Sequence, residues 1–529
     1  RIAWDIPVTD GSYRVRLHFA EPSNIGVGSR VFDIQLQDTT VEANVDIRSQ
    51  AGAYRKALVK EFDVTAAGGT GISLDLVTRS GSYGAFISGI EIFRVVPDGN
   101  AGATVDLEVS TDNGATWQPI TSGLAMNRFG GGTYLWTAGP ETIENTALIR
   151  ATAHAGAATV SDTSDEPFII ANGGTAFYVN DGSLTGDEYT TAAGSNLNSG
   201  KDPSHPMASL NALIRAYDLD PGDTVFVDTG VYDLTTNVLL TAQDSGVTIR
   251  GAVDHASILN RGNTNSGQYT VQLSGATDVT IDHLTLTGGY YGIYSASGAN
   301  SHRATISNNE ITGNYYNGIH IETGMEDVDI SSNVIHDNGN SNYGIYMYST
   351  IRGEITGNLI YNSGSNRSGI GMYITNNASS ADRTLISGNR LTNLSTGIST
   401  GSYVETFDNT VWGNSTGITT NNGGIVHGNE AFDNATGLLI SGTDSWAYDN
   451  EVYRNTTYGI NAANYARIES NRVHDNTVGI YTPGYQSEIY NNVLWDNTTI
   501  GINLGGSFNT ETAGAVNNTI HQTTGTAIK

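Results

Sequence analysis

Short runs in which apolar and polar side chains alternate fill the chain from about residue 279 to its end. Such alternation is typical of β-strands. The runs belong to a repeat that reads Asn-x-apolar-aromatic-x-Asn and then Gly-Ile, with His often in the aromatic place, as in NRVHDNTVGIY at 471–481. Its first asparagine returns at Asn309, Asn333, Asn358, Asn389, Asn409, Asn429, Asn450, Asn471, Asn492 and Asn518. A repeat this short cannot bury a face alone, so the pattern predicts stacked coils, a right-handed parallel β-helix.

The segments before the repeat have other patterns. Residues 1–97 alternate over longer runs, such as YRVRLHFAEP at 13–22, and predict an antiparallel β-sandwich with one solvent-facing side. Residues 98–171 contain TDNGATW, which supplies an Asn-Gly hairpin turn, and they predict a second, smaller sandwich. The remaining residues, 172–529, would form the β-helix.

One helix is expected near the start of the β-helix. Ser209 is suited to cap it, and Leu210, Leu213, Ile214 and Tyr217 share one face of it. The predicted fold is therefore all-β, with two N-terminal β-sandwiches followed by a right-handed parallel β-helix that carries one N-terminal capping helix.

Residues 1–97 resemble a malectin-like carbohydrate-binding domain, in LHFAEP, in GSRVFDIQLQD followed by NVDI, and in the closing ISGIEI. The resemblance implies sugar binding by loops at one end of the sandwich. It also implies that this domain is incomplete at its N-terminus. Residues 98–171 look like the immunoglobulin-like or fibronectin-like spacers of secreted bacterial proteins. The capping helix and the coils resemble the pectate-lyase-like superfamily, in which a helix covers the open end of the coil stack.

Composition limits the classes of partner that the protein is suited to bind. The net charge is −28, and the chain has no cysteine and four lysines. So acidic a protein is poorly suited to nucleic acid or to an anionic membrane surface. No apolar run approaches the roughly 20 residues that cross a bilayer. We expect an extracellular or cell-surface protein, bacterial in origin. Arg1 and Lys529 look like the ends of a piece of a longer chain, and the open last coil favours self-association or continuation into further repeats.

Strand alternation also assigns an outward side to each coil, and equivalent residues on adjacent coils form columns. The columns two and four residues after the repeat glycine collect titratable and aromatic side chains on a few adjacent coils. These side chains are Tyr294, His320, Glu322, Tyr346, Tyr348 and Tyr373. The same coils have longer loops at 336–342, 363–368 and 376–382, which we expect to wall a groove. Arg367 lies on one of these loops.

This cluster suggests chemistry on a polysaccharide. His320 and Tyr346 could act as acid and base, and Arg367 could neutralise a carboxylate, as β-elimination or C5-epimerisation of a uronic acid requires. Tyr294, Glu322, Tyr348 and Tyr373 would then bind the substrate. The coils resemble polysaccharide lyases and alginate epimerases, although no lysine lies between 202 and 528 and the epimerase signature Tyr-Gly-Phe-Asp-Pro-His is absent.

Two further features have competing interpretations. Asp329 and Glu354 fall on adjacent coils of one column, where they could bind Ca²⁺, form salt bridges with Arg303 and Arg352, or act as a catalytic dyad. A second aromatic column follows the repeat asparagine by three residues and includes Trp412, Phe432, Tyr453, His474 and Trp495. It would be either a sugar-stacking track or a set of mutually stabilising rings.

The sequence thus supports a polysaccharide-binding protein with a lyase- or epimerase-type site on the early long coils. The alternative is a non-catalytic structural module of an extracellular adhesin, surface layer or filament. The truncated look of both chain ends favours the structural alternative. The malectin-like segment and the localised aromatic cluster favour glycan binding.

Overall fold

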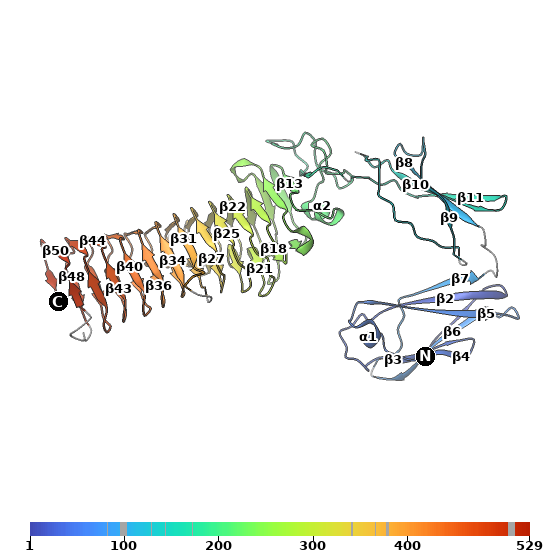
Figure 1. Cartoon of the computed structure of the whole chain (residues 1–529), viewed down its shortest axis with the longest axis horizontal. Coiled ribbons are helices and arrows are strands. Elements are labelled where there is room, and N and C mark those ends of the chain that lie inside the picture. Colours follow the sequence, from blue (N-terminus) through green and yellow to red (C-terminus); the bar gives the residue numbers. More distant parts are fainter. Residues whose placement is uncertain are drawn as a thin grey trace. The chain divides into compact units, whose positions relative to one another are not determined.

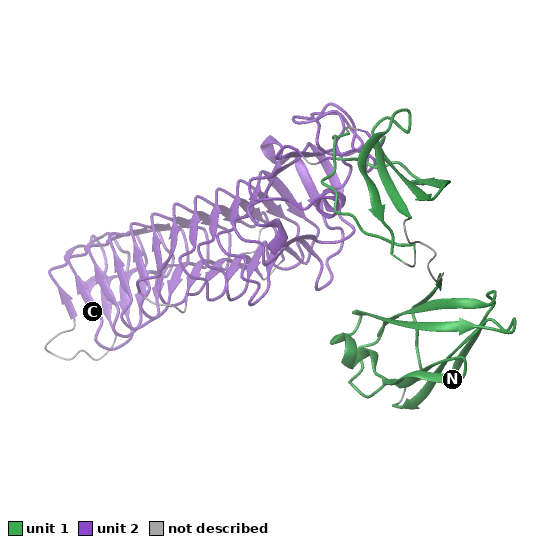
Figure 2. Cartoon of the chain, turned by 45° about the vertical axis from the view of Figure 1, so that its right-hand side comes forward, with its two compact units in different colours: residues 1–142, 146–170 green, residues 143–145, 171–529 purple. Residues whose placement is uncertain are grey.

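The computed structural model describes residues 1–81, 83–95, 103–127, 130–142, 144–171, 173–339, 342–364, 367–376, 380–505 and 514–529. Its residues form two compact units (Figure 2). The first unit comprises Arg1–Thr142 and Thr146–Ile170, and the second comprises Ile143–Asn145 and Ala171–Lys529.

The first 95 residues of unit 1 form the predicted antiparallel sandwich. One sheet has the order β1 (Ile2–Ile6), β6 (Ile72–Ser80), β3 (Val31–Leu36) and β4 (Thr39–Val45). The other has the order β5 (Ala57–Ala66), β2 (Gly11–Ala20) and β7 (Gly89–Val95). Alternate residues of β2, including Val15, Leu17 and Phe19, are buried in the core with Phe32 and Ile34. A short helix, α1 (Ile47–Ala51), is capped by the side chain of Asp46.

The next segment of unit 1 differs from the expected second sandwich. Its described residues form one antiparallel sheet, in the order β11 (Ala158–Thr163), β10 (Leu148–Ala155), β8 (Thr104–Ser110) and β9 (Gln118–Ala125). Trp136 and Phe168, from segments without a named strand, pack on its small core. The segment around Trp136 is rich in glycine, which disfavours a regular ladder.

Unit 2 is a parallel β-helix of three sheets, with the coils stacked in sequence order (Figure 1). The first solenoid sheet contains β12 (Ala176–Val179), β13 (Thr224–Val227), β16 (Thr248–Gly251), β19 (Thr280–Asp282), β22 (Thr305–Ser307), β25 (Asp329–Ser331), β28 (Glu354–Thr356), β31 (Thr384–Ser387), β34 (Val404–Phe407), β37 (Ile425–His427), β40 (Trp446–Tyr448), β43 (Arg467–Glu469), β46 (Glu488–Tyr490) and β49 (Gly514–Val516). The second contains β14 (Gly230–Asp233), β17 (Ser257–Asn260), β20 (Leu284–Thr287), β23 (Glu310–Thr312), β26 (Val334–His336), β29 (Leu359–Tyr361), β32 (Arg390–Thr392), β35 (Thr410–Trp412), β38 (Glu430–Phe432), β41 (Glu451–Tyr453), β44 (Arg472–His474), β47 (Val493–Trp495) and β50 (Thr519–His521).

The third solenoid sheet carries the residues of the candidate site. It contains β15 (Val238–Thr241), β18 (Tyr269–Ser274), β21 (Tyr291–Ser295), β24 (Ile319–Ile321), β27 (Tyr343–Met347), β30 (Ile370–Ile374), β33 (Thr396–Thr400), β36 (Thr416–Thr420), β39 (Thr436–Ile440), β42 (Tyr458–Ala462), β45 (Val478–Thr482), β48 (Ile500–Leu504) and β51 (Thr526–Ile528). Inward residues such as Ile319 and Ile345 are fully buried in one continuous core. Two 3₁₀ turns, η1 (Ala242–Asp244) and η2 (Val253–His255), interrupt the early coils.

The repeat asparagines form two buried ladders at the corners between the sheets. Asn429 is representative: its side-chain amide donates to Thr406 O at 2.9 Å and to Asn450 Oδ1 at 3.0 Å. Its own Oδ1 accepts from the backbone N–H of Asn409 at 3.0 Å. Asn429 therefore satisfies backbone groups at the corner and binds the asparagines of both adjacent coils.

Helix α2 (Leu210–Ala216) lies at the start of the coil stack. Ser209 caps it by accepting from the backbone N–H of Ala212, and Leu210 and Leu213 enter the solenoid core. The predicted capping helix is thus confirmed. No helix among the described residues is both long and apolar enough to span a membrane.

Candidate functional site

Five aromatic rings from consecutive strands of the third solenoid sheet form one stack. We call Tyr269, Tyr291, His320, Tyr346 and Tyr373 the aromatic stack. Successive ring centroids lie 5.4, 4.3, 4.5 and 5.4 Å apart, and neighbouring planes differ by 12–16°. Because each ring lies on its neighbour, the faces inside the stack are already covered. The solvent side therefore presents ring edges and phenol hydroxyls.

More tyrosines flank the aromatic stack. Tyr294 lies 4.1 Å from Tyr269 and 5.7 Å from His320, between ring centroids. Tyr348 is 39% exposed and lies 6.4 Å from Tyr346. Tyr290, Tyr315, Tyr316 and Tyr343 complete this tyrosine-rich face. The hydroxyls of Tyr346 and Tyr373 have no hydrogen-bond partner among the described residues, so they are free to bond a ligand.

The sequence interpretation missed about half of this face. It placed Tyr294, His320, Tyr346, Tyr348 and Tyr373 together; the structure pairs four of them on the third sheet, and Tyr348 follows β27 directly with its ring beside Tyr346. It overlooked Tyr269, Tyr290, Tyr291, Tyr315, Tyr316 and Tyr343. The available signal was the motif YGIY at 291–294 and again at 343–346, in which a tyrosine also precedes the glycine.

The hydrogen bonds around His320 determine which of its two ring nitrogens carries the proton. Asn317 Oδ1 accepts from the backbone N–H of Tyr343 at 3.0 Å, so its amide nitrogen must point the other way. That nitrogen lies 2.7 Å from His320 Nδ1, which must therefore accept. His320 Nε2 then carries the proton and donates to Glu322 Oε1 at 2.8 Å. Both ring nitrogens are occupied, and the side chain is buried.

His320, Tyr346 and Tyr269 stay neutral near pH 7. Burial lowers the pKa of His320, against the opposing effect of Glu322. Burial and the nearby Glu322 raise the pKa of Tyr346 to about 12, and burial with neighbouring tyrosines raises that of Tyr269 to about 12. The phenols are therefore hydrogen-bond donors, and a phenolate base is unfavourable. Neutral His320, bonded at both nitrogens, is a positioned ring and not an available base.

We expect His320 to remain neutral as the pH is lowered below its ordinary pKa of 6.5. The unfolded chain takes up the proton first, so this group destabilises the fold progressively as pH falls through 6.5. Imidazole nitrogen shifts of ¹⁵N-histidine-labelled protein, assigned with His320→Gln, should show a protonated Nε2 and a bare Nδ1. A His320 signal that titrates above pH 6.5 would contradict this arrangement.

Arg367 lies apart from His320 and Tyr346. Its guanidinium donates to the carbonyl of Asn414 at 3.0 Å. Asn414 lies two residues before β36, which is four strands beyond the His320 strand, or about 19 Å along the axis. The structure therefore does not form the expected trio. Of the loops expected to wall a groove, residues 340–341, 365–366 and 377–379 lie outside the described residues.

Asp329 and Glu354 pair in register on the first solenoid sheet, away from the aromatic stack. The prediction that Asp329 and Glu354 form salt bridges with Arg303 and Arg352 is wrong. Arg303 binds Asp278 at 2.6 Å, and Arg352 binds Asp327 at 2.7 Å. Among the described residues, no group of three or more His, Asp or Glu side chains could hold a metal ion. A Ca²⁺ ion here would have these two carboxylates as its acidic ligands.

The second aromatic column, on the second solenoid sheet, consists of rings stacked on each other. Tyr453, His474 and Trp495 have centroid separations of 5.0 and 4.0 Å, with planes within 9°. As their faces are covered, a sugar ring could not stack between them. This geometry supports mutual stabilisation as their role.

Three family matches cover parts of the chain. Residues 1–90 match the malectin domain, residues 269–431 match the right-handed β-helix region, and residues 378–524 match the periplasmic copper-binding protein NosD. The malectin-like and right-handed β-helix resemblances are thereby confirmed. The segment matched by NosD does not suit copper: it has no Cys or Met, and His427 lies on a different sheet from His474 and His521.

Known proteins resemble the chain only in part. Receptor-like protein 4 of Arabidopsis thaliana is 32% identical over 122 residues, which are 22% of this chain and 18% of that protein. A putative receptor-like protein kinase of the same plant is 34% identical over 124 residues, 21% of this chain and 14% of its own. The chain thus spans less than a fifth of the length of these relatives.

Several solved structures also align. The catalytic unit of an α-1,3-glucanase from Streptomyces thermodiastaticus has 13% identity and a TM-score of 0.40, covering 100% of this chain and 88% of its own. XylC in complex with xylose has 11% identity and a TM-score of 0.42, and the alignment covers 65% of this chain and 86% of XylC. Pectate lyase Pel9A has 13% identity and a TM-score of 0.31, and the alignment covers 64% of this chain and 79% of the lyase. Likenesses at this level do not indicate activity or substrate.

Proposed function

We propose that this chain binds a neutral polysaccharide along the tyrosine-rich face of its third solenoid sheet, as part of an extracellular or cell-surface protein. The observation that carries the proposal is the aromatic stack, which places one ring on each of five consecutive coils. A row of outward phenol edges with this spacing suits a linear polymer of hydroxyl-rich units. The malectin domain at 1–90 adds a second carbohydrate-related module.

Charge favours a neutral glycan over a uronate. The chain carries a net charge of −28, and Glu322 lies against His320 within the face. Arg367, the cation expected to neutralise a uronate carboxylate, is bonded to Asn414 several coils away. An anionic chain would meet repulsion here without a compensating charge.

The double variant Tyr346→Phe with Tyr373→Phe should weaken binding of the preferred neutral polysaccharide by about tenfold, because two hydroxyl donors are lost. The stacked rings remain, so the thermal unfolding midpoint should not change. Affinity electrophoresis in gels containing xylan, mannan, β-glucan, pectate or alginate measures the retardation. Tyr481→Phe is the matched control, because Tyr481 occupies the same column beyond the tyrosine-rich face. Equal retardation of both variants would exclude this face as the site.

We expect no β-elimination. Absorbance at 235 nm, which reports unsaturated uronate, should stay constant when the protein is incubated with pectate or alginate. His320 has no free nitrogen to accept the α-proton, and Tyr346 is protonated. A rise in absorbance that disappears in His320→Ala would restore the lyase hypothesis.

A further inference from the structure

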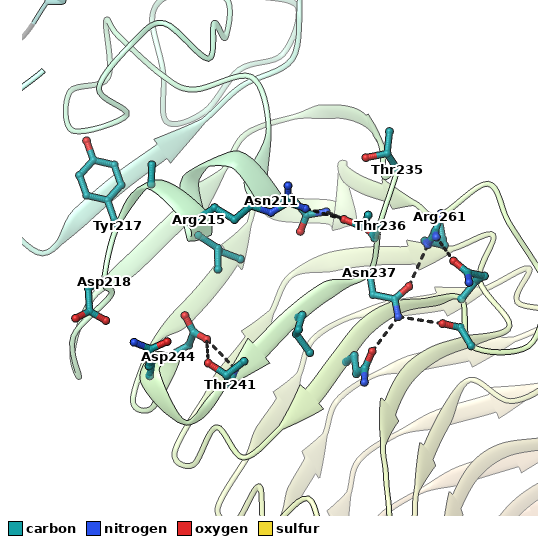
Figure 3. A pocket seen from close by; sticks show the side chains of 17 residues that line it. Asn211, Arg215, Tyr217, Asp218, Thr235, Thr236, Asn237, Thr241, Asp244 and Arg261 are labelled. Atoms are coloured by element: carbon teal, nitrogen blue, oxygen red, sulfur yellow. Dashed lines mark hydrogen bonds between the residues drawn. The ribbon is translucent and has the colours of Figure 1, made fainter. Parts of the chain in front are cut away.

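A cavity of about 830 Å³ opens beside helix α2 at the start of the third solenoid sheet (Figure 3). Asn211 and Arg215 of α2 line one side, and Thr235, Thr236 and Asn237 line another. Leu239 of β15 and Gln272 of β18 also line it. We propose that this cavity binds the terminal residue of the glycan chain that lies along the aromatic stack, which makes the site selective for chain ends. The inference rests on the proposed function.

The cavity continues directly into the tyrosine-rich face. Leu239 pairs in register with Gln272, Gln272 with Tyr294, and Tyr294 with His320. The same outward column then reaches Tyr346 and Tyr373. From Leu239 to Tyr373 this column spans five strand spacings, or about 24 Å. A single extended oligosaccharide can therefore occupy both regions.

The hydrogen bonds of the cavity force two amides to present donors. The backbone N–H of Tyr269 donates to Asn237 Oδ1 at 3.0 Å, so Asn237 Nδ2 faces Gln272 and donates to its Oε1 at 2.9 Å. The NH₂ group of Gln272 is left for a ligand. In the same way, Arg261 donates to Gln268 Oε1 and leaves the NH₂ group of Gln268 available. Neither NH₂ group has a partner among the described residues.

Acceptors also line the cavity. Asn211 Nδ2 donates to the carbonyl of Thr236 at 3.0 Å, which leaves Asn211 Oδ1 as an acceptor. Asp218 adds a carboxylate to the lining. A sugar hydroxyl both donates and accepts, so this mixture of amide donors and oxygen acceptors matches a polyol.

The charges of the lining balance, which favours a neutral sugar. Two arginines and two aspartates line the cavity. Arg261 is 6% exposed and also donates to the carbonyl of Leu234 at 2.9 Å. Asp244 accepts from the backbone N–H and the hydroxyl of Thr241 at 2.7 and 2.9 Å. Both buried charges are thus satisfied by the protein and require no ionic ligand.

The position of the cavity selects a chain end. β15 is the first strand of the third sheet, and α2 packs against it. A glycan that follows the tyrosine-rich face toward the N-terminal coils therefore meets α2 at this point. The far end of the sheet has no such obstacle along the described coils beyond Tyr373, where the column continues with Ser399 and Thr419.

The test fills the cavity and leaves the aromatic stack unchanged. The test variant is Leu239→Trp, in which a side chain that is 43% exposed in the cavity is enlarged. Val231→Trp is the matched control, because Val231 is an exposed apolar residue on β14 of the second sheet. Circular dichroism and the unfolding midpoint should match wild type in both. Calorimetry with linear hexaoses of glucose, xylose or mannose, and affinity electrophoresis with the parent polymers, measure binding.

We expect Leu239→Trp to weaken hexaose binding by about tenfold and to leave retardation by the long polymer unchanged, because a polymer offers few ends. Gln272→Leu, which removes the amide donors, should act in the same direction. Unchanged hexaose affinity in Leu239→Trp would overturn the proposal, and so would an equal loss for hexaose and polymer. Failure of the proposed function gives a different result, in which the Tyr346→Phe and Tyr373→Phe double variant binds every glycan as wild type does.

Discussion

Asn429→Ala should lower the free energy of unfolding of the solenoid by about 3–5 kcal/mol, because several buried hydrogen bonds at the corner are lost together. Asn429 is almost fully buried, and its amide donates to Thr406 O and Asn450 Oδ1. Its Oδ1 accepts from both the backbone N–H and the side chain of Asn409. Alanine removes all of these bonds and has no replacement to offer. Each buried group left without a partner costs about 1–3 kcal/mol.

The measurement is the urea unfolding transition followed by circular dichroism and by tryptophan fluorescence. Asn421→Ala provides the control, because Asn421 is exposed and its side chain makes no hydrogen bond among the described residues. We expect a large decrease in midpoint for Asn429→Ala and a change within experimental error for Asn421→Ala. Similar midpoints for the two variants would mean that the ladder contributes little to stability.

The regular part of the solenoid was predictable because two simple periods act together. Alternation within a strand decides which side chains enter the core, and the repeat length decides which residues meet on adjacent coils. These rules place His320 next to Tyr346 and Tyr346 next to Tyr373, as the structure has them. Both results depend on backbone register alone.

The aromatic stack was only partly predictable because rotamers, and not register, complete it. Tyr291 belongs to a different outward column from His320, yet its ring lies 4.3 Å from that ring. The bond from Asn317 to His320 Nδ1 likewise depends on side-chain orientation. Column assignment from sequence contains no information on how a ring leans toward its neighbour.

Irregular segments are the second reason why parts of the candidate site could not be predicted from the sequence. Arg367 lies on a long loop whose path the repeat does not define, and its guanidinium binds Asn414 beyond the expected site. The cavity beside α2 depends on how a helix packs on the first coil, for which the sequence offered only the shared face of Leu210, Leu213, Ile214 and Tyr217. Strand periodicity predicts neither arrangement, because both arise where the period is broken.

The repeat glycine that precedes the third-sheet isoleucine is required by close packing of successive coils. A Cβ atom on Gly417 would lie 2.5 Å from the carbonyl oxygen of Gly437 and 3.0 Å from Val411 Cγ2. Gly397 and Gly437 have the same relation to the next coil, at 2.6 and 2.7 Å. A backbone carbonyl can only move if the coils separate locally.

Gly417→Ala should therefore destabilise the solenoid by about 3 kcal/mol, at the upper end of ordinary overpacking, since the obstacle is backbone and not a flexible side chain. This would occur although alanine suits a strand better than glycine does. Gly182→Ala in the same unit is the control, because no atom lies within 4 Å of its added Cβ. Urea midpoints that rise or stay equal in Gly417→Ala would show that the coils can separate at little cost. The glycine column would then reflect local turn preference rather than the distance between coils.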